Sequence, residues 1–337
     1  MRVSAVCPQG IKPNLSAPAK SRDFGGPGRG RRTGPAPCHV SSAPLPCRGG
    51  SAQTSRTSHI VQILGICRFS YPCFGGFRRE HATIQDRIDF LYGEERLEER
   101  FRYFETFTLP GLRLQTDEDF KFIVLTGNQL PKAYDERLKD LLATLPQARL
   151  CQYEPLNHRE ACLKAMQEHI DPEGGVTGQF RLDDDDGVSY RFVERFREAF
   201  DDGHEVMKRE HRFAVDFNQG YTVCIDEQGI RACAQQRQYW TPALGVYIRP
   251  HVDKTVVHFR HDTIWRQMTT LTYTGEDMFV RGLNSTNGTP FKKKDFEEMV
   301  PIEGDVARAL SKSFGITEEA LEKFHAAESQ AASRAGR

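Results

Sequence analysis

Apolar residues in the main part of this chain follow two alternating patterns. Residues 59–66 and 120–127 are nearly continuous apolar runs, as expected for strands that are buried on both faces of a parallel sheet. Between these runs, Leu97, Phe101 and Phe104 recur at helical spacing. The pattern therefore predicts a strand, a helix and a second strand in that order.

The same alternation continues through the middle of the chain. A helix begins at Pro131, and its apolar face consists of Tyr134, Leu138, Leu141, Leu142 and Leu145. It is followed by a strand at 148–153, a helix at 159–169 and a strand that ends in a run of aspartates. The next helix is marked by Phe192, Phe196 and Phe200. This βαβαβ order predicts an α/β sheet with right-handed crossovers. In such sheets the ligand lies at the carboxyl ends of the strands.

Shorter apolar runs occupy the rest of the chain. They predict antiparallel hairpins built from 213–217, 221–225 and 229–233, a strand-like segment at 254–257, and two closing helices marked by Val306, Leu310 and Phe314 and by Leu321 and Phe324. Tyr239 and Trp240 follow the hairpins and offer a flat apolar surface on which a sugar ring could stack, although core packing is the more common role of such aromatic residues.

Four consecutive carboxylates, Asp183 to Asp186, lie between the apolar approach at 180–182 and Gly187. Like charges in a row need solvent, cations or a bound metal to be tolerated. Magnesium and manganese prefer oxygen ligands, commonly one or two carboxylates together with the phosphates of a substrate. Because the run follows a predicted buried strand, we interpret it as a site for a metal-bound diphosphate rather than as a solvated acidic turn.

Composition separates the first 58 residues from the rest. They hold eight of the 18 prolines, eight glycines and no hydrophobic periodicity, which predicts a disordered segment. Nine Lys and Arg against one acid give this tail a charge of +8, and the remaining 37 basic and 45 acidic residues give −8. An extension without function, a targeting segment and a nucleic-acid-binding tail all remain open readings of it.

Deletion of residues 1–58 is expected to leave the thermal unfolding midpoint unchanged, because a segment without apolar periodicity cannot bury enough surface to offset its ordering entropy. Calorimetry of the full and truncated chains measures this. A large loss of unfolding cooperativity on truncation would show that the tail belongs to the fold.

The part from 59 to 325 is long enough for one large domain, and 326–337 is expected to be a frayed terminus. No apolar run approaches the ~20 residues of a membrane span. The nine cysteines are scattered, without a Cys-x-x-Cys pair, and we interpret them as reduced, mostly buried thiols of a cytoplasmic protein.

Three segments together resemble a known family. They are Ile66-Cys67-Arg68-Phe69-Ser70, the run Leu109-Pro110-Gly111-Leu112-Arg113-Leu114-Gln115-Thr116-Asp117, and Arg181-Leu182 with the four aspartates. Residues 60–290 resemble the bacterial putative rhamnosyl transferases, which are assigned to the GT-A class of glycosyltransferases. The resemblance implies a mixed sheet with a Rossmann-like nucleotide-binding half, a DxD-type metal site, a nucleotide-diphosphate sugar donor and Mn²⁺ or Mg²⁺.

The resemblance also implies roles for individual residues. The last aspartate before Gly187 resembles the last of the DxD motif, which makes Asp184 and Asp186 the pair for ribose and metal. Strand alternation would place these two on one face and Asp183 and Asp185 on the other, one of the latter beside Arg181, unless the register is shifted by one. A late histidine, His261, resembles the third metal ligand.

Other positions match the nucleotide and acceptor regions of the family. Arg68, Phe69 and Ser70 lie where the base and ribose would be, and Arg181 adjoins the aspartates. For the catalytic base, which must reach the acceptor hydroxyl, Asp277 is the first candidate because it lies in the acceptor half. Further candidates are Glu276, Asp216 and Asp253.

The predicted function is metal-dependent transfer of a sugar, rhamnose by the family's name, from a nucleotide-diphosphate sugar to a hydroxyl of a saccharide or other acceptor, with no nucleic-acid partner. One alternative is a metal-dependent phosphohydrolase, which needs further ligands to hold two metals about 4 Å apart. The other is a non-catalytic protein that binds metal or nucleotide. An EF-hand loop is excluded because the acids do not have its spacing.

Overall fold

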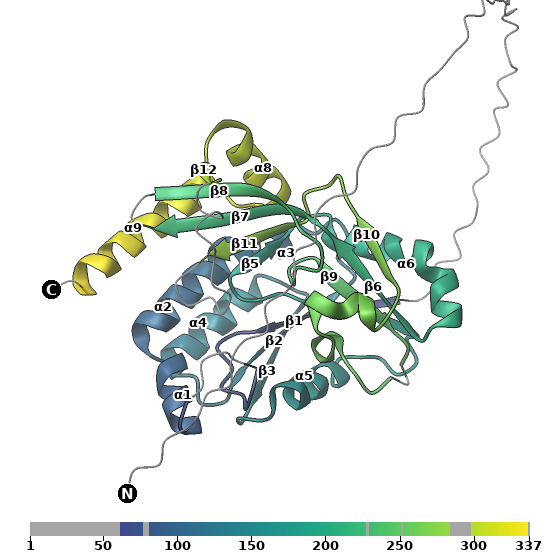
Figure 1. Cartoon of the computed structure of the whole chain (residues 1–337). Helices are drawn as coiled ribbons and strands as arrows, with labels where there is room; N and C mark the ends of the chain where they lie inside the picture. Colours follow the sequence, from purple (N-terminus) through teal and green to yellow (C-terminus); the bar gives the residue numbers. More distant parts are fainter. Residues whose placement is uncertain (1–60, 77–80, 227–228, 251, 284–297, 336–337) are drawn as a thin grey trace, which may run out of the picture. The chain divides into compact units, whose positions relative to one another are not determined.

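The structure is a computed structural model that describes residues 61–76, 81–226, 229–250, 252–283 and 298–335, with side chains up to 331 (Figure 1). The predicted tail at 1–58 lies outside the described residues.

A seven-stranded mixed sheet forms the first half of the fold. Its order is β10-β6-β9-β4-β1-β2-β3, and the strands are β1 (Val61–Arg68), β2 (Lys121–Gly127), β3 (Ala148–Tyr153), β4 (Val176–Arg181), β6 (Arg212–Phe217), β9 (Leu244–Ile248) and β10 (Thr270–Tyr273). Strands β3, β2, β1 and β4 are parallel to one another, whereas β9 runs antiparallel between β4 and β6. The predicted α/β class and mixed sheet are confirmed.

Alternate side chains of β1 enter two different cores, because successive residues of a strand point to opposite faces. Val61 and Ile63 pack with residues of α2 (Glu94–Tyr103), α4 (Lys132–Ala143) and α6 (Phe192–Arg209). Leu64 and Ile66 pack on the other face with α5 (His158–Gln167). The nearly continuous apolar run that predicts this strand is thus explained by burial on both faces.

A five-stranded sheet forms the second half, in the order β12-β8-β7-β11-β5. Its strands are β5 (Asp186–Val188), β7 (Gln219–Asp226), β8 (Gly229–Gln236), β11 (Phe279–Leu283) and β12 (Val300–Pro301). A third core joins β7 and β8 to α8 (Gly304–Phe314) and α9 (Glu318–Ala335), which are the yellow helices in Figure 1. The two predicted closing helices are confirmed.

Two predictions of local structure are wrong. Strands β6 and β7 flank Asn218 as expected, but they do not pair, because β6 joins β9 and β10 in the first sheet and β7 joins β8 and β11 in the second. The segment 254–257 is not a strand: Val256–His258 is a short 3-10 helix that Thr255 caps. In both cases tertiary contacts override a short apolar pattern that carries little information of its own.

Helix α9 continues to Ala335, although the sequence predicts a frayed end from residue 326. Its last turns are rich in Ala, Glu and Ser, and the alanines and glutamates favour a helix even where few contacts hold it. The six cysteines among the described residues are free and buried, as predicted. None of the helices in the described part of the chain is long and apolar enough to cross a membrane.

The remaining α-helices lie between β1 and β2 in the chain. Helix α1 (Ile84–Leu91) begins with a capping box of Thr83 and Asp86, and α2 continues through a π-helical turn, η1 (Phe104–Thr108), into α3 (Leu109–Arg113). Such π-helical turns are frequent at functional sites. This one lies against β5, which places it beside the aspartate run.

Candidate functional site

The aspartate run is the point at which the chain leaves the first sheet and enters the second. Strand β4 ends at Arg181 and β5 begins at Asp186. Between them the N–H of Asp186 donates to the carbonyl of Asp183 at 3.1 Å, which makes the run a four-residue turn. Side chains therefore do not alternate here, and the prediction that Asp184 and Asp186 share a strand face is wrong.

Close backbone packing holds the turn in this shape. The N–H of Gly282 donates to the carbonyl of Asp185 at 3.0 Å, and a Cβ at Gly282 would collide with that carbonyl. A Cβ at Gly187 would collide with the carbonyl of Phe107 in the π-helical turn. On the same side, Oγ1 of Thr108 donates to the carbonyl of Asp186 at 2.8 Å. Only glycine permits both approaches.

One side of the turn faces a buried arginine. Nη1 of Arg100 in α2 lies 3.1 Å from Oδ1 of Asp184 and 3.3 Å from Oδ2 of Asp185, and all three side chains are at least nine-tenths buried. Burial raises the pKa of Asp184 to about 6 although Arg100 opposes the shift. Burial alone would lower the pKa of Arg100, but the two carboxylates raise it overall. Arg96 adds a second positive charge to this side of the turn.

The other side of the turn carries Asp183, which is the most exposed of the four aspartates with a side chain 34% accessible. Nη2 of Arg181 donates to Oδ2 of Asp183 at 3.1 Å and also reaches Oγ1 of Thr241 at 3.3 Å. Burial would raise the pKa of Asp183, but Arg181 and Arg68 outweigh it and hold that pKa below its usual value. The predicted contact between Arg181 and an odd-numbered aspartate is present.

Asp186 shares its charged neighbours with Asp183. It lies opposite Arg281 of β11 in the register of the second sheet, and Arg181 and Arg281 act electrostatically on both carboxylates. Burial and the adjacent Asp185 raise the pKa of Asp186 well above its usual value. The turn thus presents Asp183 and Asp186 to one set of arginines, and Asp184 and Asp185 to another.

Two histidines flank the side that carries Asp183. Nδ1 of His158 lies 3.3 Å from Nη1 of Arg68, and burial together with Arg68 lowers the pKa of His158 to about 3, so the ring is neutral and accepts this hydrogen bond. Nδ1 of His261 lies 2.7 Å from the carbonyl of Tyr239. Burial lowers the pKa of His261, and Asp183 lies near enough to raise it slightly. The structure therefore brings His261 to the same side as Asp183.

The three-residue segment predicted to contact the nucleotide is only partly available to it. The ring of Phe69 is fully buried and packs against Phe101 and Phe104 with centroid distances of 4.8 and 5.2 Å, so the prediction that it lines the nucleotide is wrong. Oγ of Ser70 accepts from Arg96 at 3.0 Å, and Ser70 has a left-handed backbone with φ 48°. Arg68 remains beside the turn.

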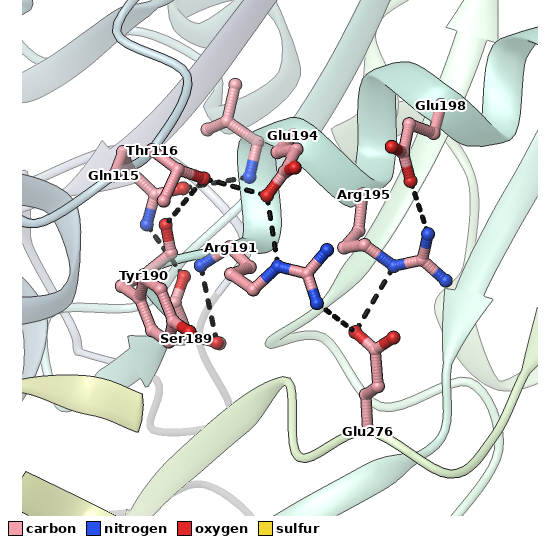
Figure 2. Close-up of polar contacts among 10 residues, drawn as sticks. Gln115, Thr116, Ser189, Tyr190, Arg191, Glu194, Arg195, Glu198 and Glu276 are labelled. Atoms are coloured by element: carbon pink, nitrogen blue, oxygen red, sulfur yellow. Dashed lines mark hydrogen bonds and ion pairs between the residues drawn. The ribbon is translucent and has the colours of Figure 1, made fainter. Parts of the chain in front are cut away.

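The acidic loop before β11 belongs to a different network, at the start of α6. Nε of Arg195 donates to Glu276 at 3.2 Å and Nη1 of Arg191 lies 3.7 Å from the same carboxylate (Figure 2). Arg191 also donates to Glu194 at 3.0 Å, and Arg195 pairs with Glu198. Glu276 therefore serves as a structural anion among these arginines.

Asp277, the first candidate for the catalytic base, lies next to that network. Its Oδ1 accepts from Gln219 at 2.9 Å. Asp277 precedes Arg281, which is the partner of Asp186, by four residues, a distance of ~13 Å along an extended chain. No hydrogen bond or ion pair among the described residues links Asp277 to the aspartate turn, so the fold does not bring the two together.

Asp216 lies near the end of β6, at the carboxyl edge of the first sheet, and is fully buried. Burial raises its pKa to about 6, while the N–H of Tyr239 and the hydroxyl of Thr272 oppose the shift. A carboxyl whose pKa is raised on folding contributes to the unfolding free energy. The contribution is complete below the unfolded pKa of about 4 and is lost as the pH rises through 6.

Asp216→Asn is therefore expected to gain up to ~3 kcal/mol in unfolding free energy relative to the native chain between pH 4 and pH 7. Because the variant lacks only this titration, the contributions of all other groups cancel in the difference. Urea denaturation of both proteins at several pH values measures it. Parallel stability curves would contradict a raised pKa.

Several residues of the site escape sequence reasoning. They are Arg100, His158 and Thr241, which come from separate segments of the chain, and nothing local marks them as neighbours of the aspartates. The sequence gives only a weak indication that Arg100 is buried: it directly precedes the core residue Phe101 and so lies at the edge of the apolar face of its helix.

A family model described as "Putative rhamnosyl transferase" matches residues 62–295. No curated protein matches the sequence significantly.

The fold was also compared with solved structures. S. aureus TarS 1-349 matches with 8% identity and a TM-score of 0.34, covering 66% of this chain and 60% of that chain, which is less than two thirds of its length. The same protein in complex with UDP matches with 9% identity and a TM-score of 0.35, covering 79% and 70%. A "putative nucleotide-diphospho-sugar transferase" from Desulfovibrio desulfuricans G20 matches with 13% identity and a TM-score of 0.30, covering 67% and 83%.

Proposed function

The chain belongs to the putative rhamnosyl transferase family, a family of glycosyltransferases, and from this membership we propose that it transfers a sugar, by the family's name rhamnose, from a nucleotide-diphosphate donor to an acceptor hydroxyl with the help of a divalent cation. The observation that carries the proposal is the turn between the two sheets. It holds Asp183 and Asp186 on one side, at the carboxyl edge where α/β sheets bind their ligands.

The carboxylates of this turn fit a metal that is shared with a diphosphate. Among the described residues, no group of three or more His, Cys, Asp and Glu side chains is arranged to hold a metal without other ligands. Magnesium and manganese, however, are commonly bound by one or two carboxylates plus substrate phosphates, and the turn supplies two. We propose Asp183 and Asp186 for this role, with His261 nearby, in place of the predicted Asp184. When bound, such a cation would stabilise the charge that develops on the leaving diphosphate.

The residues around the turn have distinct tasks in this proposal. Arg68 and Arg181 balance Asp183 and offer positive charge to the diphosphate, and Arg281 does the same beside Asp186. Asp184 and Asp185 face Arg100, so they hold the turn against α2 rather than contact the donor. Asp277 is left out of the proposed site because of its distance from the turn.

A donor screen tests the proposal. The full chain is incubated with manganese, a mixture of acceptor saccharides and single nucleotide-sugars, and release of the nucleoside diphosphate is measured. Release that depends on an added acceptor supports transfer. Release of phosphate from simple phosphate esters, with no nucleotide-sugar consumed, would favour a phosphohydrolase instead.

Nucleoside diphosphate and manganese are expected to bind together, because two carboxylates hold such a cation weakly until phosphate oxygens complete its shell. Isothermal titration of the chain with a panel of nucleoside diphosphates should give tighter binding in manganese buffer than in chelator. Equal affinity in the two buffers would eliminate the shared metal and leave the arginines as the only counter-charges of the diphosphate.

A further inference from the structure

A buried carboxylate at the edge of the site has no part in the proposed metal binding. Asp216 is 0% exposed, and its two oxygens accept hydrogen bonds from the N–H of Tyr239 at 2.9 Å and from Oγ1 of Thr272 at 3.2 Å. No ion pair in the described part of the chain includes it. A buried carboxylate without a cation costs free energy, so a reason for its presence is needed.

The backbone that Asp216 contacts is strained. Residues 237–243, which we call the crossing loop, lead from β8 in the second sheet to β9 in the first. Tyr239 and Ala243 in this loop have left-handed φ angles of 61° and 57°, although neither is glycine. A left-handed backbone is unfavourable for a residue with a side chain, and strain of this kind persists only where surrounding contacts hold it.

The crossing loop contacts three side chains of the site. The carbonyl of Tyr239 lies 2.7 Å from Nδ1 of His261, Oγ1 of Thr241 lies 3.3 Å from Nη2 of Arg181, and the ring of Trp240 lies 4.9 Å from the guanidinium of Arg281. A conformational change of the loop would therefore displace three side chains that interact electrostatically with Asp183.

The contact with His261 also fixes a tautomer. A carbonyl oxygen can only accept a hydrogen bond, so Nδ1 of His261 must carry the proton. In the neutral ring with this tautomer, Nε2 carries a lone pair that can bind a ligand. A hydrogen bond of this kind from the other ring nitrogen typically orients a histidine that binds a metal.

We propose that Asp216 is a positioning residue that holds the crossing loop in its strained conformation and thereby fixes the tautomer and orientation of His261 beside Asp183. The link to catalysis rests on the proposed function, but the positioning itself does not. The rival role, a catalytic base, requires a carboxylate oxygen that can reach the acceptor hydroxyl. Both oxygens of Asp216 instead accept hydrogen bonds from protein groups.

The substitutions Asp216→Asn and Asp216→Ala separate the two roles. Asparagine keeps an oxygen for the N–H of Tyr239 and can donate its amide to Oγ1 of Thr272, whereas alanine removes both contacts. The readout is the pair of ¹⁵N imidazole resonances of His261, assigned with His261→Gln in ¹⁵N-histidine-labelled full chain and recorded without substrate or metal.

The Asn variant is expected to keep the native tautomer signature and, with a donor from the screen, transfer within about threefold of the native rate. The Ala variant is expected to show mixed tautomers and a loss of ~10–100-fold in transfer. A native His261 spectrum in the Ala variant would overturn the positioning role. Loss of transfer in the Asn variant with an unchanged spectrum would overturn it in favour of a base.

A second variant keeps the test decisive if Asp216→Ala unfolds. Glycine adopts a left-handed backbone without strain, so Tyr239→Gly should relieve the need for the anchor. The double variant Asp216→Ala/Tyr239→Gly is then expected to regain folding and the native tautomer, since the carbonyl at position 239 is retained. No recovery relative to the single Ala variant would overturn the strain argument. Because the spectra need no substrate, this failure is distinguishable from a failure to transfer sugar.

Discussion

Asp183→Asn and Asp186→Asn are each expected to reduce sugar transfer by ~100-fold or more while leaving the fold intact. Each substitution keeps the size of the side chain but removes a carboxyl oxygen from the side of the turn that faces Arg181 and Arg281. The effect should fall mainly on kcat, since the charge of the leaving diphosphate is largest in the transition state. Steady-state kinetics with the donor identified by the screen measures it.

Asp184→Asn is the matched control. It makes the same substitution in the same turn, but on the side that faces Arg100, where Asp185 still provides a counter-ion at 3.3 Å. We expect its activity to fall less than tenfold. If instead Asp184→Asn were severe and Asp183→Asn mild, side chains in the run would alternate as in a strand, and the turn described above would not be the active arrangement.

Arg100→Met is expected to destabilise the protein by ~3–5 kcal/mol, because it removes the buried arginine that lies within ion-pair distance of the carboxylates of Asp184 and Asp185. Methionine fills a similar volume, so the loss reports charge rather than a cavity. Urea denaturation at pH 7 gives the change in unfolding free energy. A loss below ~1 kcal/mol would show that water reaches these carboxylates.

Arg137→Met provides the comparison at the surface. Arg137 also contacts two carboxylates, those of Glu98 at 2.9 Å and Glu105 at 2.7 Å, but its side chain is 33% exposed and theirs are 41% and 37% exposed. Exposed pairs contribute little, so we expect a loss of ~1 kcal/mol or less, including its contact with the ring of Phe101. The difference between the two variants isolates the effect of burial.

The framework of the fold is predictable from the sequence wherever a long periodic pattern meets a buried face. The strand at 148–153 has the predicted bounds, and Leu138 and Leu142 lie in the core as their spacing indicates. Short patterns fail for a physical reason. The apolar segments 213–217 and 221–225 suit a strand equally well in either sheet, and only contacts with β9 and β11 decide which sheet each joins.

The site is less predictable than the fold. Four aspartates in a row have no hydrophobic periodicity, so no residue within the run indicates which side chains face the core. The turn also depends on a hydrogen bond from Gly282, almost one hundred residues further along the chain. Arg100 pairs with Asp184 over 84 positions. The family resemblance located the region, but which aspartate faces the donor is a property of tertiary packing.

The short connection between β4 and β5 also limits how the protein can move. Only four residues, Leu182 to Asp185, separate the last residue of one sheet from the first residue of the other. A hinge motion that opened the two sheets would have to bend through this segment and break the hydrogen bond between Asp183 and Asp186. Large-amplitude domain closure of the kind used by two-lobed enzymes is therefore incompatible with an intact site. If the turn opens as one cooperative unit, the amide hydrogens of Asp186 and Gly282 should exchange with solvent at the same rate.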